Sequence, residues 1–522
     1  MSTPAPDTAL PSTGTRADEV PQWTRLSTRM LIIHPVQHII QAAPALLGLL
    51  VAGTTSDHGP LWGVIGAGVA VCFGLLRWFT TTYRISPEQV QVRRGLLRRR
   101  VLSVPRDRIR TVDLTAPAMH RVLGMTRVTV GTGLSNNSRN DGLRLDALMA
   151  PTAAELREEL LHRRPSAHTA HTATDTPAPA GPAEGTTLAR LSPRWIGYGP
   201  FTLSGLVTVS IIGAFLSRFI NEFHVDPSRY GAARQAGERL LHTPVPVLVT
   251  ELVAALLVLA AIASTCGYVL AFWNFRLVRL PGGTLHVTRG LITTRATTIE
   301  ERRLRGVEVS EPLLLRIVRG ARCIAIATGL RVGRGAERGG SLLLPSAPRA
   351  EAVRVASVIL RHEDPIVAPL TAHGSAARRR RYTRALVPCL VLVGLLVVAW
   401  RLGLPGWLPL VGLLSLPIAT LLAADRYRSL GHRLIDGILV TRRGSLVRRR
   451  CALPCDGIIG WNVHQSFFQR RAGLATLTAT TAGGGQAYPV QDIAAADVAG
   501  LAETALPGLL RPFLVEAEQQ SS

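Results

Sequence analysis

The chain has 522 residues, a formal net charge of +25, 47% hydrophobic residues and a mean hydropathy of +0.23. Its six cysteines do not make a disulfide framework, and the apolar yet basic composition is typical of an integral membrane protein with cationic faces. All 59 basic residues are arginines, whose planar guanidinium binds phosphate through paired hydrogen bonds. A GC-rich genome also explains their abundance.

Taken in chain order, the sequence begins with a polar tail and continues with six hydrophobic segments in pairs. Residues 1–22 are rich in Pro, Thr, Ser and Ala and lack the apolar core of a signal peptide, so we expect residues 1–29 to form a disordered cytosolic tail. A membrane-spanning helix needs roughly 20 apolar residues. The segments that meet or approach this requirement are 30–51, 61–79, 196–216, 252–275, 386–400 and 402–424.

In the sequence, arginines gather just before the first segment and just after the second segment of each pair. Arg378 to Arg381 precede the fifth segment, and Arg426 and Arg428 follow the sixth. Positive charge beside a span marks its cytosolic end. We therefore expect both termini, and the three polar blocks that follow the pairs, to face the cytosol.

These three blocks repeat a spacing of glycines and prolines. An Arg-Gly pair is followed ten residues later by Pro105, Glu300 or Pro454, and a second glycine comes 29, 30 and 29 residues after the first. Alternating apolar and polar residues before and after the Arg-Gly pair predict two strands joined by a turn. A further strand follows the second glycine, and a helical pattern ends each block. The Arg-Gly pairs are Arg94-Gly95, Arg289-Gly290 and Arg443-Gly444; the second glycines are Gly124, Gly320 and Gly473.

With its preceding hydrophobic pair, each block resembles the bacterial pleckstrin-homology-like (PH-like) proteins called membrane-flanked domain proteins. The resemblance covers residues 31–510 as three copies. It implies a bent seven-stranded sheet capped by a C-terminal helix, and it describes a fold more than an activity, because the family's function is largely unassigned. The second copy departs from the pattern at Glu300, which replaces the proline, and at Pro281, which with two glycines interrupts the first strand.

We therefore predict membrane α-helical hairpins, six transmembrane helices in all, and three cytosolic PH-like β domains that each end in a helix. The expected hairpins are 30–82, 194–274 and 385–424, and the PH-like domains are 83–162, 275–362 and 425–512. The tail is 1–29, and the linkers are 163–193 and 363–384.

The most charged features are the Arg-Gly turns of the first and third copies. Near the bilayer, such hairpin tips would bind anionic lipid head groups at about 1 kcal/mol per arginine. Alternatively, the arginines only follow the positive-inside bias and contact head groups without selectivity. The candidates are Arg93, Arg94, Arg98, Arg99 and Arg100 in the first copy and Arg442, Arg443, Arg448, Arg449 and Arg450 in the third.

Other chemistry has little support in the sequence. There is no nucleophile elbow, phosphate loop or spaced carboxylate pair, so we predict no enzyme and no cofactor. Cys451 and Cys455 lie near His464 but lack a second ligand pair, so we predict no metal. No basic strand interleaved with aromatic residues is present, so we expect no nucleic-acid partner.

These observations favour a scaffold or assembly module of the plasma (inner) membrane, multi-pass and with cytosolic termini. Its expected partners are the lipid bilayer with its anionic phospholipids, other proteins, or further copies of the chain. The alternative is a transporter or a transport or secretion accessory subunit, in which Glu251 and His38 would be proton sites.

Overall fold

The computed structural model describes residues 23–25, 68, 82–86, 88–94, 100–106, 109, 111–131, 142–153, 156, 185–202, 204–222, 244–329, 341–362 and 364–509. These residues fall into two compact units, which are described separately. One comprises Met1–Ile109 and Leu145–Met149, and the other comprises Arg110–Arg144 and Ala150–Ser522. The predicted hydrophobic segments 30–51 and 61–79 lie outside the described residues, apart from Gly68.

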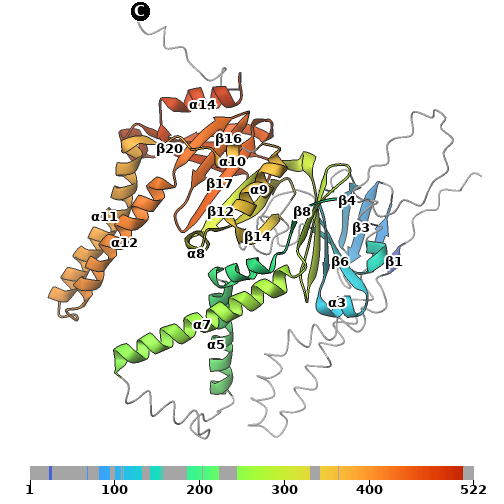
Figure 1. Cartoon of the computed structure of the whole chain (residues 1–522), viewed down its shortest axis with the longest axis horizontal. Coiled ribbons are helices and arrows are strands. Elements are labelled where there is room, and N and C mark those ends of the chain that lie inside the picture. Colours follow the sequence, from blue (N-terminus) through green and yellow to red (C-terminus); the bar gives the residue numbers. More distant parts are fainter. Residues whose placement is uncertain are drawn as a thin grey trace, which may run out of the picture. The chain divides into compact units, whose positions relative to one another are not determined.

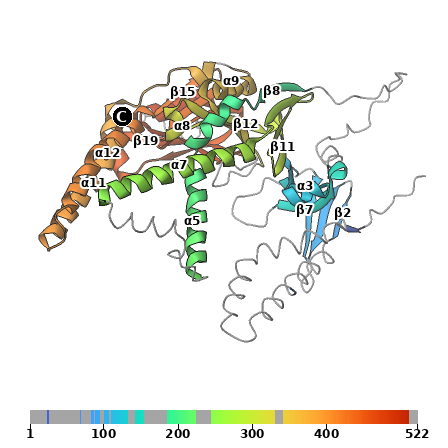
Figure 2. The same cartoon turned by 60° about the horizontal axis from the view of Figure 1, so that its bottom comes forward.

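Three of the described helices are long and apolar enough to cross a membrane: α7 (Val245–Phe272), α11 (Gly374–Arg401) and α12 (Leu408–Arg428). A fourth span results if η2 (Pro193–Phe201) and α5 (Ser204–Glu222), which meet at a 59° bend, are counted as one. Helices α11 and α12 lie side by side in both views (Figure 1 and Figure 2). Their basic ends share one end of the hairpin, because α11 begins and α12 ends with arginines.

The second and third copies consist of the same succession of elements, in which four strands precede a short helix, two strands follow it, and a longer helix closes the copy. In the second copy they are β9 (Arg276–Leu280), β10 (Thr284–Arg289), β11 (Thr294–Glu300), β12 (Leu304–Pro312), α8 (Leu313–Ile317), β13 (Gly320–Ala327), β14 (Leu342–Pro348) and α9 (Arg349–Leu360). In the third they are β15 (Gly431–Ile435), β16 (Ile438–Arg443), β17 (Val447–Pro454), β18 (Ile458–His464), α13 (Phe467–Arg471), β19 (Leu474–Thr481), β20 (Ala487–Ala494) and α14 (Asp497–Ala505).

The first copy repeats this order in its described parts. Its strands are β2 (Thr82–Ile85), β3 (Gln89–Arg94), β4 (Arg100–Pro105), β5 (Thr111–Ala116), β6 (Met125–Gly131) and β7 (Gly142–Met149), with α3 (Ala118–Val122) after β5. Pro105, Glu300 and Pro454 are each the last residue of the third strand of their copy. The expected alignment of the three copies at this position, where glutamate replaces proline in the second copy, is therefore confirmed.

An additional strand precedes each pair of hydrophobic segments. Strand β1 (Thr24–Arg25) pairs with β2, β8 (Thr186–Arg190) pairs with β9, and Thr371 forms a single bridge with β15. In the sequence, the hydrophobic pair thus lies between the first and second strands of the first two PH-like domains, and between the bridge residue Thr371 and β15 in the third. Strand β8 lies in the stretch 163–193, which the sequence indicated as a linker. It was not predicted, because five residues of modest hydrophobicity carry too weak a periodic signal to indicate a strand.

The sheets run across the boundaries between copies. Strand β5 of the first copy pairs with β11 of the second, in a sheet ordered β6-β5-β11-β10-β9-β8. Strand β12 of the second copy pairs in the same way with β17 of the third, in a sheet ordered β14-β13-β12-β17-β16-β15 (Figure 1). The PH-like domains are therefore fused edge to edge, which the sequence did not predict.

Both faces of the second of these sheets contribute residues to a hydrophobic core. Val307, Val440 and Ala452 share one face and belong to the core of the second copy, together with residues of α9. Leu439 and Leu453 point from the opposite face into the core of the third copy. Since one sheet closes two cores, the second and third copies form a single packed body.

Candidate anion-binding site

The site begins at the Arg-Gly turns, which lie against the ends of apolar helices. Gly444 has φ +102°, and a Cβ there would come within 2.0 Å of the Val447 carbonyl oxygen, so glycine is required. Arg442 donates hydrogen bonds to the carbonyls of Arg428 (2.9 Å) and Ser429 (3.2 Å) at the end of α12. The positive guanidinium thus caps the negative end of the helix dipole.

The turn of the second copy has the same placement. Gly290 has φ +111° and donates its N–H to the carbonyl of Trp273 at the end of α7. The Arg289 guanidinium lies 5.3 Å from the ring centre of Phe272, the last residue of that helix. In both copies, therefore, the Arg-Gly turn lies against the C-terminal end of an apolar helix.

The five predicted arginines of the third copy divide between the two faces of the sheet. The pairing of β16 with β17 places Arg442, Arg448 and Arg450 on one face and Arg443 and Arg449 on the other. In the first copy Arg93 is half-buried in β3. The side chains of Arg94, Arg98, Arg99 and Arg100 lie outside the described residues.

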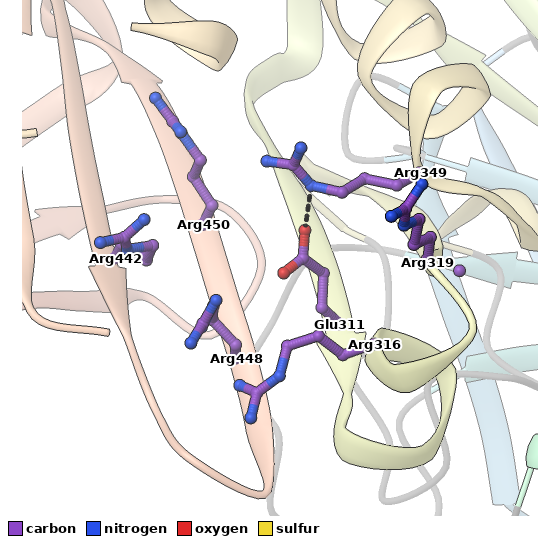
Figure 3. Close-up of a pocket in the computed structure, with 8 residues that line it drawn as sticks. Glu311, Arg316, Arg319, Arg349, Arg442, Arg448 and Arg450 are labelled. Carbon is purple, nitrogen blue, oxygen red and sulfur yellow. Dashed lines mark hydrogen bonds and ion pairs between the residues drawn. The ribbon is translucent and has the colours of Figure 1, made fainter. Parts of the chain in front are cut away.

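Three of the predicted arginines meet three that were not predicted, around a cavity of about 150 Å³. Figure 3 shows Arg442, Arg448 and Arg450 on β16 and β17, with Glu311 of β12 between them and the arginines of the second copy. The cavity lies where the second copy joins the third. Its lining is Glu311, Arg316, Arg319, Gly320, Arg349, Arg442, Arg448 and Arg450.

The carboxylates around the cavity satisfy only part of this charge. Glu311 Oε1 accepts from Arg349 Nε at 2.7 Å. Asp425, in the last turn of α12, accepts from Arg316 at 3.0 Å and from Arg448 at 3.1 Å. Six guanidinium groups therefore face two carboxylates, one lining the cavity and one behind it.

Two of the arginines have donors without a partner. The Nε atoms of Arg448 and Arg450 are buried, and neither forms a hydrogen bond within the described part of the chain. Arg450 is only 9% exposed, and its Nη2 donates to the carbonyls of Pro365 and Ala368 at 3.1 and 2.7 Å. A buried charged donor without an acceptor is costly, and an anion in the cavity would supply one.

The electrostatics of the cavity point the same way. Burial lowers the pKa of Arg450 to about 10; Arg442 and Arg349 lower it as well, and Glu311 opposes the change. Burial, and then the charge of Arg448, also lower the pKa of Arg442. The protonated arginines thus repel one another, and a bound phosphate-like group would relieve that repulsion.

Arg319 occupies a position that is glycine in the other copies. Its carbonyl accepts the N–H of Arg349, as the carbonyls of Gly124 and Gly473 accept those of the corresponding residues. Arg319 has φ +55°, a left-handed conformation that glycine adopts freely, as Gly124 and Gly473 do here. The sequence pattern aligned Gly320 with Gly124 and Gly473, at a spacing of 30 instead of 29 residues. The structure corrects this alignment, because the equivalent position is Arg319, one residue earlier.

The remaining predicted residues lie apart from this cavity. Glu251 is exposed near the start of α7, and His38 lies outside the described residues. Cys451 and Cys455 are buried free thiols. Within the described ranges, no three His, Cys, Asp or Glu side chains are grouped so as to hold a metal ion.

Comparison with protein families supports the threefold organisation. The family model described as Bacterial PH domain matches residues 37–164, 239–361 and 385–506, which together exceed half of the chain. The three matches confirm the three tandem copies indicated by the glycine spacing. No curated protein and no solved structure matches the chain.

Proposed function

The chain belongs to the Bacterial PH domain family, and on that premise we propose that it is a non-enzymatic scaffold of the plasma (inner) membrane whose domain junction binds anionic phospholipid. In this proposal the six hydrophobic segments all span the membrane, and the termini and PH-like domains are cytosolic. The observation that carries the proposal is the convergence of six arginines on one cavity at the end of an apolar helix.

The position of the cavity favours a lipid over a soluble anion. Asp425 connects it directly to the last turn of α12, through Arg316 and Arg448. Leu446, at the tip of the β16–β17 hairpin, and Ile317, at the end of α8, are exposed apolar residues beside these arginines. Apolar side chains next to guanidinium groups at a helix end suit the boundary between acyl chains and phosphates.

The proposed topology rests on the basic ends of the helices. Arg378 to Arg381 at the start of α11 and Arg426 with Arg428 at the end of α12 favour the cytosol for that end. The turn between α11 and α12 then faces outward. A membrane-impermeant maleimide should label Leu404→Cys in intact cells and should not label Arg433→Cys, and the reverse result would refute this topology.

Lipid binding is tested with full-length, delipidated protein by native mass spectrometry. Phosphatidylglycerol should be retained in preference to phosphatidylcholine. The double variant Arg319→Asn with Arg349→Gln should bind phosphatidylglycerol roughly thirtyfold more weakly, because each arginine near the head groups contributes about 1 kcal/mol.

A matched control removes two arginines from the same copy, away from the cavity. Arg302 pairs with Glu300, and Arg361 pairs with Glu301 and, like Arg319, has a positive φ. Arg302→Gln with Arg361→Asn should therefore leave the preference for phosphatidylglycerol intact. If the two double variants lose affinity equally, the cavity has no selective role and the arginines only follow the positive-inside bias.

A further inference from the structure

The two junctions between copies have the same register. At the first, Thr298 pairs with Val112; at the second, Ala452 pairs with Val307. In each case the eighth residue after the turn glycine opposes the twelfth residue before the left-handed position that precedes the next strand. Two independent pairs of strands with one register indicate a specific mode of association between PH-like domains, repeated along the chain.

A side-chain contact accompanies this pairing at both junctions. Arg121 Nη1 donates to the carbonyl of Leu291 at 2.7 Å, and Arg316 Nη1 lies 3.5 Å from the carbonyl of Ser445. Each arginine is the fourth residue of its short helix, α3 or α8, and each acceptor directly follows the turn glycine of the next copy. In the third copy the fourth residue of α13 is also an arginine, Arg470.

Two sheet edges, one in the first copy and one in the third, have no neighbouring strand among the described residues. Among the described residues, β4 is the last strand of the sheet β1-β2-β3-β4, and β18 is the first of the sheet β18-β19-β20. Strand β4 of the first copy corresponds to β11 and β17, and β18 of the third corresponds to β5 and β12. The unpaired edges are therefore equivalent to the two strands that pair with each other at each junction.

Residues on these two edges are exposed, whereas the equivalent residues at the junctions are buried. Leu102 in β4 is 44% exposed, whereas the equivalent Thr297 and Cys451 are 8% and 2% exposed. Val463 in β18 is 50% exposed, whereas the equivalent Val309 is 2% exposed. Natural edge strands are usually protected by charges, prolines or bulges, but these edges present apolar side chains.

We propose that β18 of one molecule pairs antiparallel with β4 of a second copy of this chain, continuing the junction register between molecules. The register places Trp461 opposite Ser103 and Val463 opposite Val101, which is itself exposed. Arg470 then repeats the contact made by Arg121 and Arg316. Because the two edges differ, the contact is head to tail and builds a closed ring or an open row along the membrane surface.

Disulfide crosslinking in native membranes tests this arrangement. Two full-length copies with different tags, one carrying Val463→Cys and the other Val101→Cys, are co-expressed and oxidised. A heterodimer carrying both tags is expected. The control pairs Val463→Cys with Leu102→Cys, which lies one residue out of register on the opposite face of the strand, and it should crosslink at least fivefold less.

Either of two crosslinking results would overturn the proposal. One is equal crosslinking in the registered and control pairs. The other is a double-cysteine chain that crosslinks only within itself, which would mean that its two edges close on each other. As an independent measurement, Val463→Lys should shift the purified full-length protein from oligomer to monomer in native mass spectrometry. Ile317→Lys changes another exposed apolar residue outside the two edge strands and should leave the oligomer intact. A monomeric wild type, or an unchanged Val463→Lys oligomer, would also refute it.

Discussion

Replacing Glu311 by Gln isolates the charge imbalance of the arginine cavity. The side chain is largely buried, accepts from Arg349 at 2.7 Å, and its charge also raises the pKa values of Arg442 and Arg450. Removing one partner of a buried ion pair costs about 3–5 kcal/mol, but Arg349 is more than half exposed. We therefore expect the substitution to destabilise the anion-free protein by about 2 kcal/mol.

The informative measurement is how an anion changes this loss. Thermal unfolding of the full-length protein is followed in phosphatidylcholine micelles with and without phosphatidylglycerol. Because the variant cavity carries one more net positive charge, the anionic lipid should stabilise Glu311→Gln more than wild type. A ligand at a hundred times its dissociation constant adds about 2.7 kcal/mol, which is enough to offset the loss.

Glu301→Gln is the matched control. Glu301 is similarly buried and pairs with Arg279 and Arg361, but it lies outside the cavity. It should lose a comparable amount of stability and regain no more than wild type does with phosphatidylglycerol. If the two variants respond alike to the anionic lipid, the cavity does not bind the head group and the reasoning fails.

Three further predictions concern the fold around the cavity and the third copy. Gly444→Ala should cost at least about 2 kcal/mol in a denaturant titration, because of its positive φ and the Val447 carbonyl, whereas Gly485→Ala, with open space around it, should change stability by less than about 0.5 kcal/mol. Burial lowers the pKa of His432 to about 4, so between pH 6.5 and 4 the unfolded chain binds a proton that the folded chain does not. The free energy of unfolding should therefore fall by about 1–2 kcal/mol as pH decreases through that window. His432→Gln should remove this part of the pH dependence. Asp492→Asn should cost about 3 kcal/mol and speed amide exchange in the first turns of α11, since the carboxylate is 1% exposed and holds Arg380 at 2.6 Å; unchanged exchange would contradict this.

Much of the fold could be predicted because it depends on local pattern. The Arg-Gly turns are determined by residues close in sequence, and the structure places Gly290 and Gly444 in tight turns with positive φ. The apolar runs of α7, α11 and α12 are likewise legible without tertiary information. The joining of β5 to β11 and of β12 to β17 was not predicted, because strand pairing between copies leaves no periodic signal in either strand.

The candidate site was predicted only in part for the same reason. Arg442, Arg448 and Arg450 stand out in the sequence because they bracket a turn. Their partners Arg316 and Arg349 come from a short helix and from a helix start more than 90 residues earlier, and they reach the cavity only because β12 pairs with β17. The dense run of arginines around the turn predicted the residues on β16 and β17, whereas the residues of the second copy reach the cavity through the pairing of β12 with β17.

The two junctions differ in the side chains that stand at the positions of the cavity arginines. Both share one register, so backbone geometry alone does not create the site. At the first junction the positions of the cavity arginines are mostly neutral: Thr288, Thr294, Ala296, Gly124 and Ala150 stand where the second junction has Arg442, Arg448, Arg450, Arg319 and Arg349.

Only Arg121 and Arg316, which make the shared contact with the following turn, are arginine at both junctions. This division separates two roles. The strand register and the shared arginine join the domains at both junctions, whereas the five additional arginines occur only at the second junction, where they line the cavity. Replacing Arg316 should therefore weaken the junction itself, while Arg319→Gly should restore the glycine conformation of the other copies, leave the junction intact and reduce anion affinity alone. A loss of junction pairing in Arg319→Gly would show that the two roles are not separable.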